Sequence, residues 1–257
     1  MLQEETTPYR DNELSRRIII FCLIMTLGSV PFVTGESVSK ADAHTKDMVV
    51  LLHGLGRNET AMWWLADRLE DGGYEVHRIG YNSIKTTPDE MIETVTQEIN
   101  ECCGEDSRTV HFVGHSLGGL LIRAYLESNR PRKLGNTVLL GTPNNGSAVA
   151  DRVKDHPLVE YLLPVATELG TDPDSLPNRL PPPDYPVGII AGVVESELRQ
   201  HFLPGPSDGV VPVESTKLEG MTDFIEIESW HSMMRYDTEV AEQTLHFLEH
   251  QRFSHNP

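Results

Sequence analysis

The sequence predicts an α/β domain with a mostly parallel central sheet and helices on both faces. Continuous apolar runs alternate with apolar residues at helical spacing, first in Met48–Leu52 and then in Met62–Glu70. Runs without polar alternation are typical of parallel strands that are buried on both faces. Reactive residue types lie at the carboxyl ends of three of these runs, at His53, Ser116 and Thr142. Since ligands bind at the carboxyl ends of parallel strands, we expect these three residues to face one crevice.

The other elements continue this alternation along the chain. Further strands are expected at Tyr74–Ile79, Val110–Gly114, Asn136–Leu140, Val187–Ala191 and Asp223–Ile227. Long helices are expected after Thr87, over Ser116–Glu127 and over Thr238–His250. The first of these has the clearest start, because Thr87 can cap it and Pro88 suits its first position.

Residues 148–205 interrupt this rhythm. Two short helices, Ala148–His156 and Leu158–Leu169, and a proline-rich irregular segment, Leu176–Pro186, precede the strand Val187–Ala191 that returns to the sheet. Because the insertion lies beside the expected crevice, we interpret it as a cap or lid that shapes the pocket. A surface excursion without substrate contact is the alternative.

The composition is that of a globular protein with an acidic surface. The chain has 257 residues, of which 39% are hydrophobic and 23% charged, and its formal net charge is −18. A general nucleic-acid binder would need a basic patch, so we expect no nucleic-acid partner. The same charge argues against adsorption to anionic lipid by electrostatics alone. The sequence does not predict an oligomeric state.

Residues 1–46 have the pattern of an export signal or membrane anchor plus a polar linker, which leaves 47–257 as the folded domain. Paired arginines precede an apolar run, and cleavage could fall after Gly35. The run is short for a membrane span, which needs about 20 residues, but residues 18–35 could serve as an uncleaved anchor. We therefore expect export to the periplasm or the medium, or inner-membrane anchoring with the domain outside. A buried N-terminal helix is the alternative.

The cysteines indicate neither a disulfide framework nor a metal site. Cys22 lies in the apolar N-terminal run, and Cys102 and Cys103 are adjacent near a helix end. We expect these two not to pair with each other, because the bridge geometry would be strained there. No metal motif and no glycine-rich dinucleotide or phosphate loop is present, so no metal or other cofactor is expected.

The segment Gly114-His115-Ser116-Leu117-Gly118 has the pattern G-x-S-x-G between an expected strand and an expected helix. This is the nucleophile elbow, in which the serine sits on a strained turn at the end of the sheet. The flanking glycines allow the strand and the helix to pack closely enough to hold the turn. Ser116 is therefore the candidate nucleophile. A glycine-rich turn with an idle serine is the alternative.

A serine nucleophile needs a base, and the base needs a residue that orients it. In sheets with this elbow the acid and then the histidine follow later strands. Asp208 lies in a turn-rich loop after Val187–Ala191, and His231 follows Asp223–Ile227 directly. These two residues are the candidate acid and base, with Glu195 and Glu197 as alternatives for the acid. His201 could line the pocket.

An oxyanion hole needs two N–H donors. Leu117, which opens the helix after the serine, supplies one, and the glycine-flanked Leu55 in the loop after the first strand supplies the other. His53, Gly54 and His115 belong to the two loops around the nucleophile, and we expect them to border the bound substrate.

These pieces together resemble the α/β-hydrolase fold, and within it the small bacterial lipase-like serine hydrolases. The resemblance rests on His53–Arg57, Gly114–Gly119, Gly141–Ser147, Ser207–Pro212 and Trp230–Ser232, which come in the family's order within residues 47–253. It implies Ser116, His231 and Asp208 as a catalytic triad, an oxyanion hole from Leu55 and Leu117, and hydrolysis of small-molecule or lipid carboxylic esters. Chain-length preference is not implied, because the family varies in the lid.

Two alternatives to ester hydrolysis stay open. An acyltransferase would use the same triad with an alcohol in place of water as the acceptor. A non-catalytic binding module could retain the fold, since fold does not determine function. An intact triad argues against the binding module, which has no need of all three residues.

Overall fold

The computed structural model describes residues 47–104, 108–153, 161, 164–194 and 205–255. They fall in one compact unit that runs from Thr45 to Pro257. The expected export signal or anchor, with residues 18–35, lies outside the described residues, as do Glu195, Glu197 and His201. Within the described ranges no helix is both long and apolar enough to span a membrane.

A single sheet of six parallel strands organises the domain. The spatial order is β2-β1-β3-β4-β5-β6, and the strands are β1 (Met48–Leu52), β2 (Glu75–Ile79), β3 (Val110–His115), β4 (Leu134–Leu140), β5 (Val187–Gly192) and β6 (Asp223–Ile227). Along the chain, β1 is followed by β2 at the edge of the sheet, and β3 then pairs with the other side of β1. This reversal of strand order makes the carboxyl ends of β1 and β3 the expected place for a ligand. The predicted parallel α/β architecture is confirmed.

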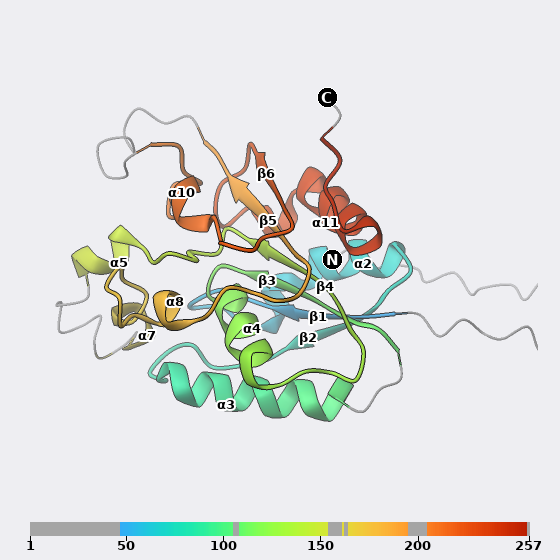
Figure 1. Ribbon diagram of the computed structural model, residues 1–257, viewed down its shortest axis with the longest axis horizontal. Helices are drawn as coiled ribbons and strands as arrows, with labels where there is room; N and C mark the ends of the chain where they lie inside the picture. Colours follow the sequence, from blue (N-terminus) through green and yellow to red (C-terminus); the bar gives the residue numbers. More distant parts are fainter. Residues whose placement is uncertain (1–46, 105–107, 154–160, 162–163, 195–204, 256–257) are drawn as a thin grey trace, which may run out of the picture. The chain divides into compact units, whose positions relative to one another are not determined.

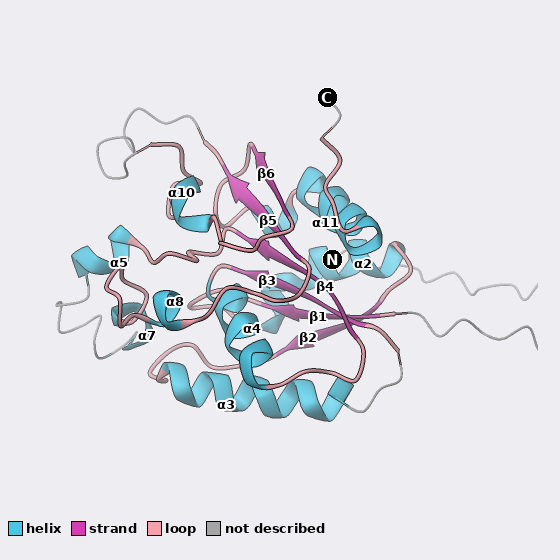
Figure 2. Ribbon diagram, viewed as in Figure 1, coloured by secondary structure: helices cyan, strands magenta, loops and turns pink. Residues whose placement is uncertain are grey.

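Helices of very different lengths connect these strands (Figures 1 and 2). The long ones are α2 (Trp63–Asp71), α3 (Pro88–Ile99), α4 (Leu117–Ser128) and α11 (Thr238–His250). The short ones are α5 (Ala148–Val153), α7 (Pro164–Thr167), α8 (Leu176–Arg179) and α10 (Val213–Thr216). Two 3₁₀ turns, η1 (Glu59–Met62) and η3 (Met234–Tyr236), and a π-helical turn, η2 (Asn100–Gly104), complete the described elements.

The core consists of two layers, one on each face of the sheet. Alternate residues of β1 point to opposite faces, and all of them are buried. Val50 and its same-face neighbours pack with α3 and α4, whereas Val49 and Leu51 pack with α2 and α11. Figure 1 shows these two pairs of helices on opposite sides of the sheet. Burial on both faces is the physical reason for the continuous apolar runs in the sequence.

The helix starts follow the local chemistry of the chain. Thr87 caps α3 by accepting from the Glu90 N–H, and the Glu90 carboxylate accepts from the Thr87 N–H in return. Within its described residues, the insertion differs from the prediction at its proline-rich segment. The segment Leu176–Pro186, expected to be irregular, begins with the helical turn α8. Pro177 suits the first turn of a helix, because its missing N–H would have no intrahelical partner there.

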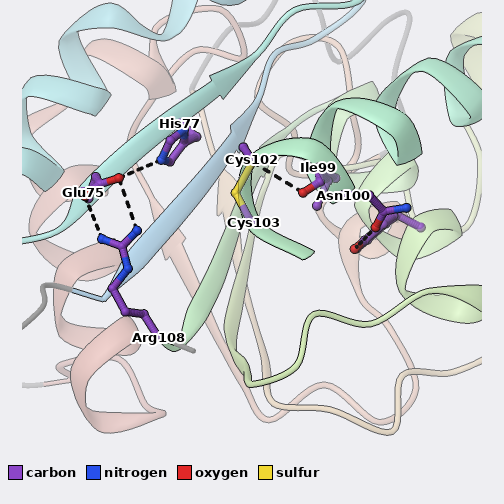
Figure 3. Close-up of a disulfide and its surroundings, with 8 residues drawn as sticks. Glu75, His77, Ile99, Asn100, Cys102, Cys103 and Arg108 are labelled. Atoms are coloured by element: carbon purple, nitrogen blue, oxygen red, sulfur yellow. Dashed lines mark hydrogen bonds and ion pairs between the residues drawn. A yellow bond between two sulfur atoms is a disulfide. The ribbon is translucent and has the colours of Figure 1, made fainter. Parts of the chain in front are cut away.

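The two adjacent cysteines form a disulfide, which contradicts the prediction that they would not pair (Figure 3). The sulfur atoms are 2.03 Å apart. The prediction placed both cysteines near the end of the helix that follows Thr87. In the structure α3 ends at Ile99, and the chain continues in the wider π-helical turn Asn100–Gly104. The backbone at the cysteines therefore differs from the geometry on which the prediction rested.

Candidate active site

Ser116 sits at the junction of β3 and α4 in a backbone conformation that non-glycine residues rarely adopt. Its φ is 56° and its ψ is −123°. The turn is held by very close approach of strand and helix. A Cβ atom on Gly114 would lie 2.6 Å from the Gly119 Cα, and one on Gly118 would lie 2.5 Å from the Leu52 carbonyl oxygen. These glycines therefore leave the room in which the strained turn can form.

The structure brings Ser116, His231 and Asp208 into one hydrogen-bonded row. The Ser116 Oγ lies 3.0 Å from the His231 Nε2, and the His231 Nδ1 lies 2.6 Å from the Asp208 Oδ2. His231 comes from the loop after β6, and Asp208 from the loop after β5, so three different strand ends supply the row. Asp208 is 1% exposed and His231 is 9% exposed.

Backbone hydrogen bonds fix the Asp208 carboxylate on its other side. Its Oδ1 accepts from the N–H groups of Val210, at 2.9 Å, and of Val211, at 2.7 Å. Its own carbonyl accepts from the His231 N–H at 2.9 Å. The Oδ1 therefore binds the backbone of the turn, and the Oδ2 binds the imidazole of His231. This arrangement orients the ring of His231 so that its Nδ1 carries the proton and its Nε2 can accept one from Ser116.

Gly141 marks a further tight contact that sequence analysis included only as part of a longer motif. Its φ is 54°, in the left-handed region that favours glycine. A Cβ atom there would lie 2.9 Å from the Asp208 Oδ2 and 3.2 Å from the His231 Nδ1. A glycine directly after a buried strand, before Thr142, was the available signal for this close approach.

His115 forms a hydrogen bond to the backbone of His231. Its ring is buried, and its Nε2 donates to the His231 carbonyl at 2.8 Å. Burial lowers the pKa of His115 well below its usual value of 6.5, and the neighbouring His231 lowers it further. The ring is therefore neutral in the folded protein. Because Nε2 must carry the proton to donate, Nδ1 is unprotonated, and it has no hydrogen-bond partner among the described residues.

The two expected oxyanion donors come from different elements. Leu117 is the first residue of α4, where a helix N–H has no intrahelical acceptor. Leu55 lies in the loop after β1, which is fixed by a hydrogen bond of 2.9 Å from the Gly56 N–H to the Ser83 Oγ. Within the described residues, neither the Leu55 N–H nor the Leu117 N–H has a hydrogen-bond acceptor.

A cavity of about 340 Å³ opens beside Ser116 and His231. Its wall is mostly apolar, and Val149, Ala150, Ala166 and Leu169 of the insertion 148–205 contribute to it. The described residues that line it are Gly54, Leu55, Arg57, His115, Ser116, Pro143, Ser147, Val149, Ala150, Ala166, Leu169, Val210, Val211, His231, Ser232 and Arg235. An apolar pocket with a few convergent polar groups is the usual form of a small-molecule site.

The cavity includes some of the expected residues and omits others. Gly54 and His115 line it, whereas His53 and Thr142 are not among its lining residues. His53 is fully buried and stacks on Tyr81 with ring centroids 4.0 Å apart. Of the three residues expected to face one crevice, only Ser116 reaches the cavity. His53 and Thr142 instead lie inside the domain at the strand ends.

Arg57 and Arg235 line the cavity although the sequence did not predict them as pocket residues. Arg57 is the last residue of the segment His53–Arg57, which the resemblance included without assigning Arg57 a role. Arg235 lies in η3, four positions beyond His231, and no pattern in the sequence distinguishes it from a surface arginine.

Within the described residues, one group of side chains offers several ligand atoms of the types that bind metals. The ligand atoms of His77, Cys102 and Cys103 lie within 4.8 Å of one another. The two sulfur atoms are joined in the disulfide, and Figure 3 shows His77 in a hydrogen bond to Glu75. Thiolate is the form of cysteine that binds metals, so the oxidised pair is not a metal site.

Comparison with known proteins bears on the fold of the chain. The family model for palmitoyl protein thioesterase matches residues 48–172, which include Ser116 but neither Asp208 nor His231. A comparison with curated protein sequences finds no match.

Among solved structures, a lipase of Bacillus licheniformis, BlEst2 in its mature form, is 21% identical with a TM-score of 0.56. The match covers 73% of this chain and 85% of the lipase. A Listeria innocua gene product is 17% identical with a TM-score of 0.54, over 82% of this chain and 100% of its own. A monoacylglycerol lipase of Paleococcus ferrophilus is 20% identical with a TM-score of 0.50, over 79% and 93%. The parallel sheet, its strand order and these similarities show that the chain has the α/β-hydrolase fold.

Proposed function

We propose that this protein is a serine hydrolase that cleaves carboxylic esters, with Ser116 as nucleophile, His231 as general base and Asp208 as the orienting acid. The observation that carries the proposal is the continuous row of hydrogen bonds from Ser116 through His231 to Asp208, which ends in an apolar cavity. The similarity to lipases in fold and the match to a thioesterase family support it.

The proposed reaction has two stages. His231 takes the proton of the Ser116 hydroxyl, and the Oγ attacks the carbonyl carbon of the ester. The tetrahedral intermediate collapses as His231 gives the proton to the leaving alcohol, which leaves an acyl group on Ser116. Water, deprotonated by His231, then attacks the acyl-enzyme and releases the carboxylic acid. Asp208 keeps the imidazole in the reactive tautomer and stabilises the imidazolium that forms.

The negative charge of the intermediate would be held by the N–H groups of Leu55 and Leu117. Both belong to backbone that is fixed before the reaction, one at the start of α4 and the other in the loop after β1. Preorganised donors of this kind stabilise the transition state without reorganisation, and loss of one typically raises the barrier by about 3 kcal/mol.

The apolar wall of the cavity would bind the acyl chain, and the contribution of the insertion 148–205 supports its interpretation as a cap. A thioester is the second candidate for the scissile group, because the family model that matches residues 48–172 is that of palmitoyl protein thioesterase. Both groups react through the same acyl-enzyme. An ester and a thioester with the same acyl chain therefore separate the two candidates directly.

The first experiment combines a fluorophosphonate probe with para-nitrophenyl esters of increasing chain length. The wild type is expected to be labelled and to release nitrophenol, whereas Ser116→Ala is expected to do neither. Ser232→Ala is the matched control, because Ser232 also lines the cavity but forms no hydrogen bond to the imidazole of His231. Labelling of folded Ser116→Ala, or inertness of the wild type to the probe and to every ester and thioester, would reject the proposal.

A further inference from the structure

Among the described residues, the lining of the cavity carries two positive charges and no acidic side chain. Arg57 and Arg235 both line it, while no aspartate or glutamate of the described ranges does. This is unusual for the chain as a whole, in which acidic residues outnumber lysine and arginine by 39 to 21. Other arginines of the described residues have an acidic partner close by, as Arg68 has in Asp67 at 2.8 Å and Arg108 in Glu75 at 2.7 Å.

Arg235 is buried, and its guanidinium has donors without acceptors. The residue is 7% exposed, and its Nε and Nη1 have no hydrogen-bond partner among the described residues. The contact that it does make is with a π system, because its Cζ lies 4.8 Å from the ring centroid of Tyr236. A buried charged group without acceptors is destabilising, so natural structures pair such groups or place them where a ligand completes them.

Arg57 approaches the same part of the cavity from a different element. It lies in the loop after β1, is exposed, and has no hydrogen bond or ion pair with the residues that the structure describes. Both guanidinium groups act on the buried ring of His115, whose pKa they lower further after burial and His231 have done so. The two arginines therefore line the same cavity as His115, the residue that precedes Ser116.

We propose that Arg235 and Arg57 bind an anionic oxygen-bearing group of the substrate, so that the preferred ester carries a carboxylate or a phosphate close to the scissile bond. This inference rests on the proposed ester hydrolase function and specifies its substrate class. The planar guanidinium of Arg235 can donate in parallel to two oxygens of either group. An anion would supply the acceptors that Nε and Nη1 lack, while the apolar wall holds the acyl chain.

Two pairs of substrates test the proposal, each pair differing in one charged group. The first pair is a monoacylglycerol and its phosphate ester, assayed by release of the fatty acid. The second pair is the para-nitrophenyl monoester of glutaric acid and para-nitrophenyl valerate, assayed by release of nitrophenol. Preference in the first pair alone identifies a phosphate on the alcohol side of the ester, and preference in the second alone identifies a carboxylate on the acyl side.

The expected result is a higher kcat/KM of the wild type for the charged member of at least one pair. Arg235→Gln is expected to lower that preference about tenfold or more, the usual effect of a lost charge-assisted hydrogen bond, and Arg57→Gln to lower it less because Arg57 is exposed. Arg68→Gln on α2 is the control and should retain the wild-type ratio. No preference in either pair, or an equal loss for both members in Arg235→Gln, would overturn the proposal.

Thermal melting separates a binding role from a structural one. Since the buried guanidinium lacks acceptors, replacing it with an apolar side chain in Arg235→Met should not lower the melting temperature. A marked decrease would instead show that Arg235 stabilises the fold and would count against the proposal.

A binding measurement keeps the anion site distinct from the proposed reaction. Calorimetry with Ser116→Ala and the monoacylglycerol phosphate or glutarate is expected to show binding of at least one anion that the added change Arg235→Gln abolishes. If no ester is hydrolysed but this binding is found, the proposed function fails and the anion site stands. If esters are hydrolysed and neither anion binds, the anion site fails alone.

Discussion

Replacing Asp208 with asparagine tests the proposed mechanism at the point where the structure is most specific. Asparagine has the shape of aspartate, but one of its two oxygens becomes an NH₂ donor. The Oδ1 position accepts from the N–H groups of Val210 and Val211, and the Oδ2 position accepts from the His231 Nδ1. The NH₂ group must therefore face either two backbone donors or one imidazole nitrogen.

The backbone donors decide the orientation. If the NH₂ group faced Val210 and Val211, two buried N–H groups would lose their acceptor, at about 1–3 kcal/mol each. The amide oxygen should therefore keep the Oδ1 position, and the NH₂ group should face His231. The His231 Nδ1 must then accept, so its proton moves to Nε2 and points at the Ser116 Oγ. In that tautomer His231 cannot take the serine proton.

The expected loss is close to that known for such a change in serine proteases, about 10⁴-fold in kcat. At about 1.4 kcal/mol per factor of ten, this corresponds to about 5.5 kcal/mol of transition-state stabilisation. Stability should change far less, because the shape and the two backbone hydrogen bonds are kept.

The assay compares kcat of Asp208→Asn with the wild type on one nitrophenyl ester, with circular dichroism as the check on folding. Asp223→Asn is the matched control. Asp223 also accepts from two backbone N–H groups, those of Phe224 and Phe253, and also pairs with a histidine, His255 at 2.9 Å, but it does not line the cavity. A folded Asp208→Asn protein that retains more than about a tenth of wild-type kcat would refute the tautomer argument.

Four further predictions concern packing, capping, pH and export. Gly119→Ala should lower the melting temperature strongly, because the new Cβ would lie 2.1 Å from the Thr142 Oγ1. The double variant with Thr142→Ala should regain part of the lost melting temperature. A double variant that melts no higher than Gly119→Ala would contradict the contact. Thr87→Ala should lower the free energy of unfolding in urea by about 1 kcal/mol without changing kcat. The pKa of His115 is lowered from 6.5 in the folded protein. Below about pH 6.5 the unfolded chain therefore binds a proton at this residue that the folded chain does not bind. The free energy of unfolding should then decrease as the pH falls, by up to about 1.4 kcal/mol per pH unit. In urea titrations from pH 7 to pH 5, the free energy of unfolding of His115→Gln should decrease less steeply than that of the wild type. Equal pH slopes for the two proteins would contradict this. We also propose that residues 1–46 direct export, which a reporter enzyme fused behind them tests by its appearance outside the cytoplasm.

The sequence predicted the sheet well because burial on both faces imposes a continuous apolar pattern. Met48–Leu52, which is buried at every residue, was predicted with the bounds that the structure gives. The edge strand Asp223–Ile227 is only partly buried and contains two acidic residues, yet its bounds were also predicted. The short elements α8, α10 and η3 were not predicted, because a single turn has no hydrophobic periodicity to detect. The disulfide was predicted wrongly for a related reason. The sequence did not indicate that α3 would end at Ile99, and the predicted geometry of Cys102 and Cys103 depended on that end.

The candidate site also has residues that the sequence predicted and residues that it did not. Ser116, Asp208 and His231 could be predicted because each follows a strand, and the ends of parallel strands meet at one edge of a sheet. The cavity wall could not be predicted, because its residues come from short helices and loops whose direction depends on tertiary packing. Arg235 illustrates the limit: what distinguishes it is burial without acceptors, and neither property is visible in a sequence.

The position of Arg235 also links substrate selection to the reaction itself. It lies four residues after His231, on a segment whose backbone is fixed at both polar groups of His231. The His231 N–H donates to the Asp208 carbonyl at 2.9 Å, and the His231 carbonyl accepts from the His115 Nε2 at 2.8 Å. An anion bound by Arg235 would therefore be held relative to the base and the nucleophile by fixed backbone. Because proximity and orientation lower the barrier as well as improve binding, we expect the anionic group to raise kcat and not only to lower KM. If Arg235→Gln raised KM for the charged ester and left its kcat unchanged, the anion would contribute binding alone, and the geometric link would be disproved.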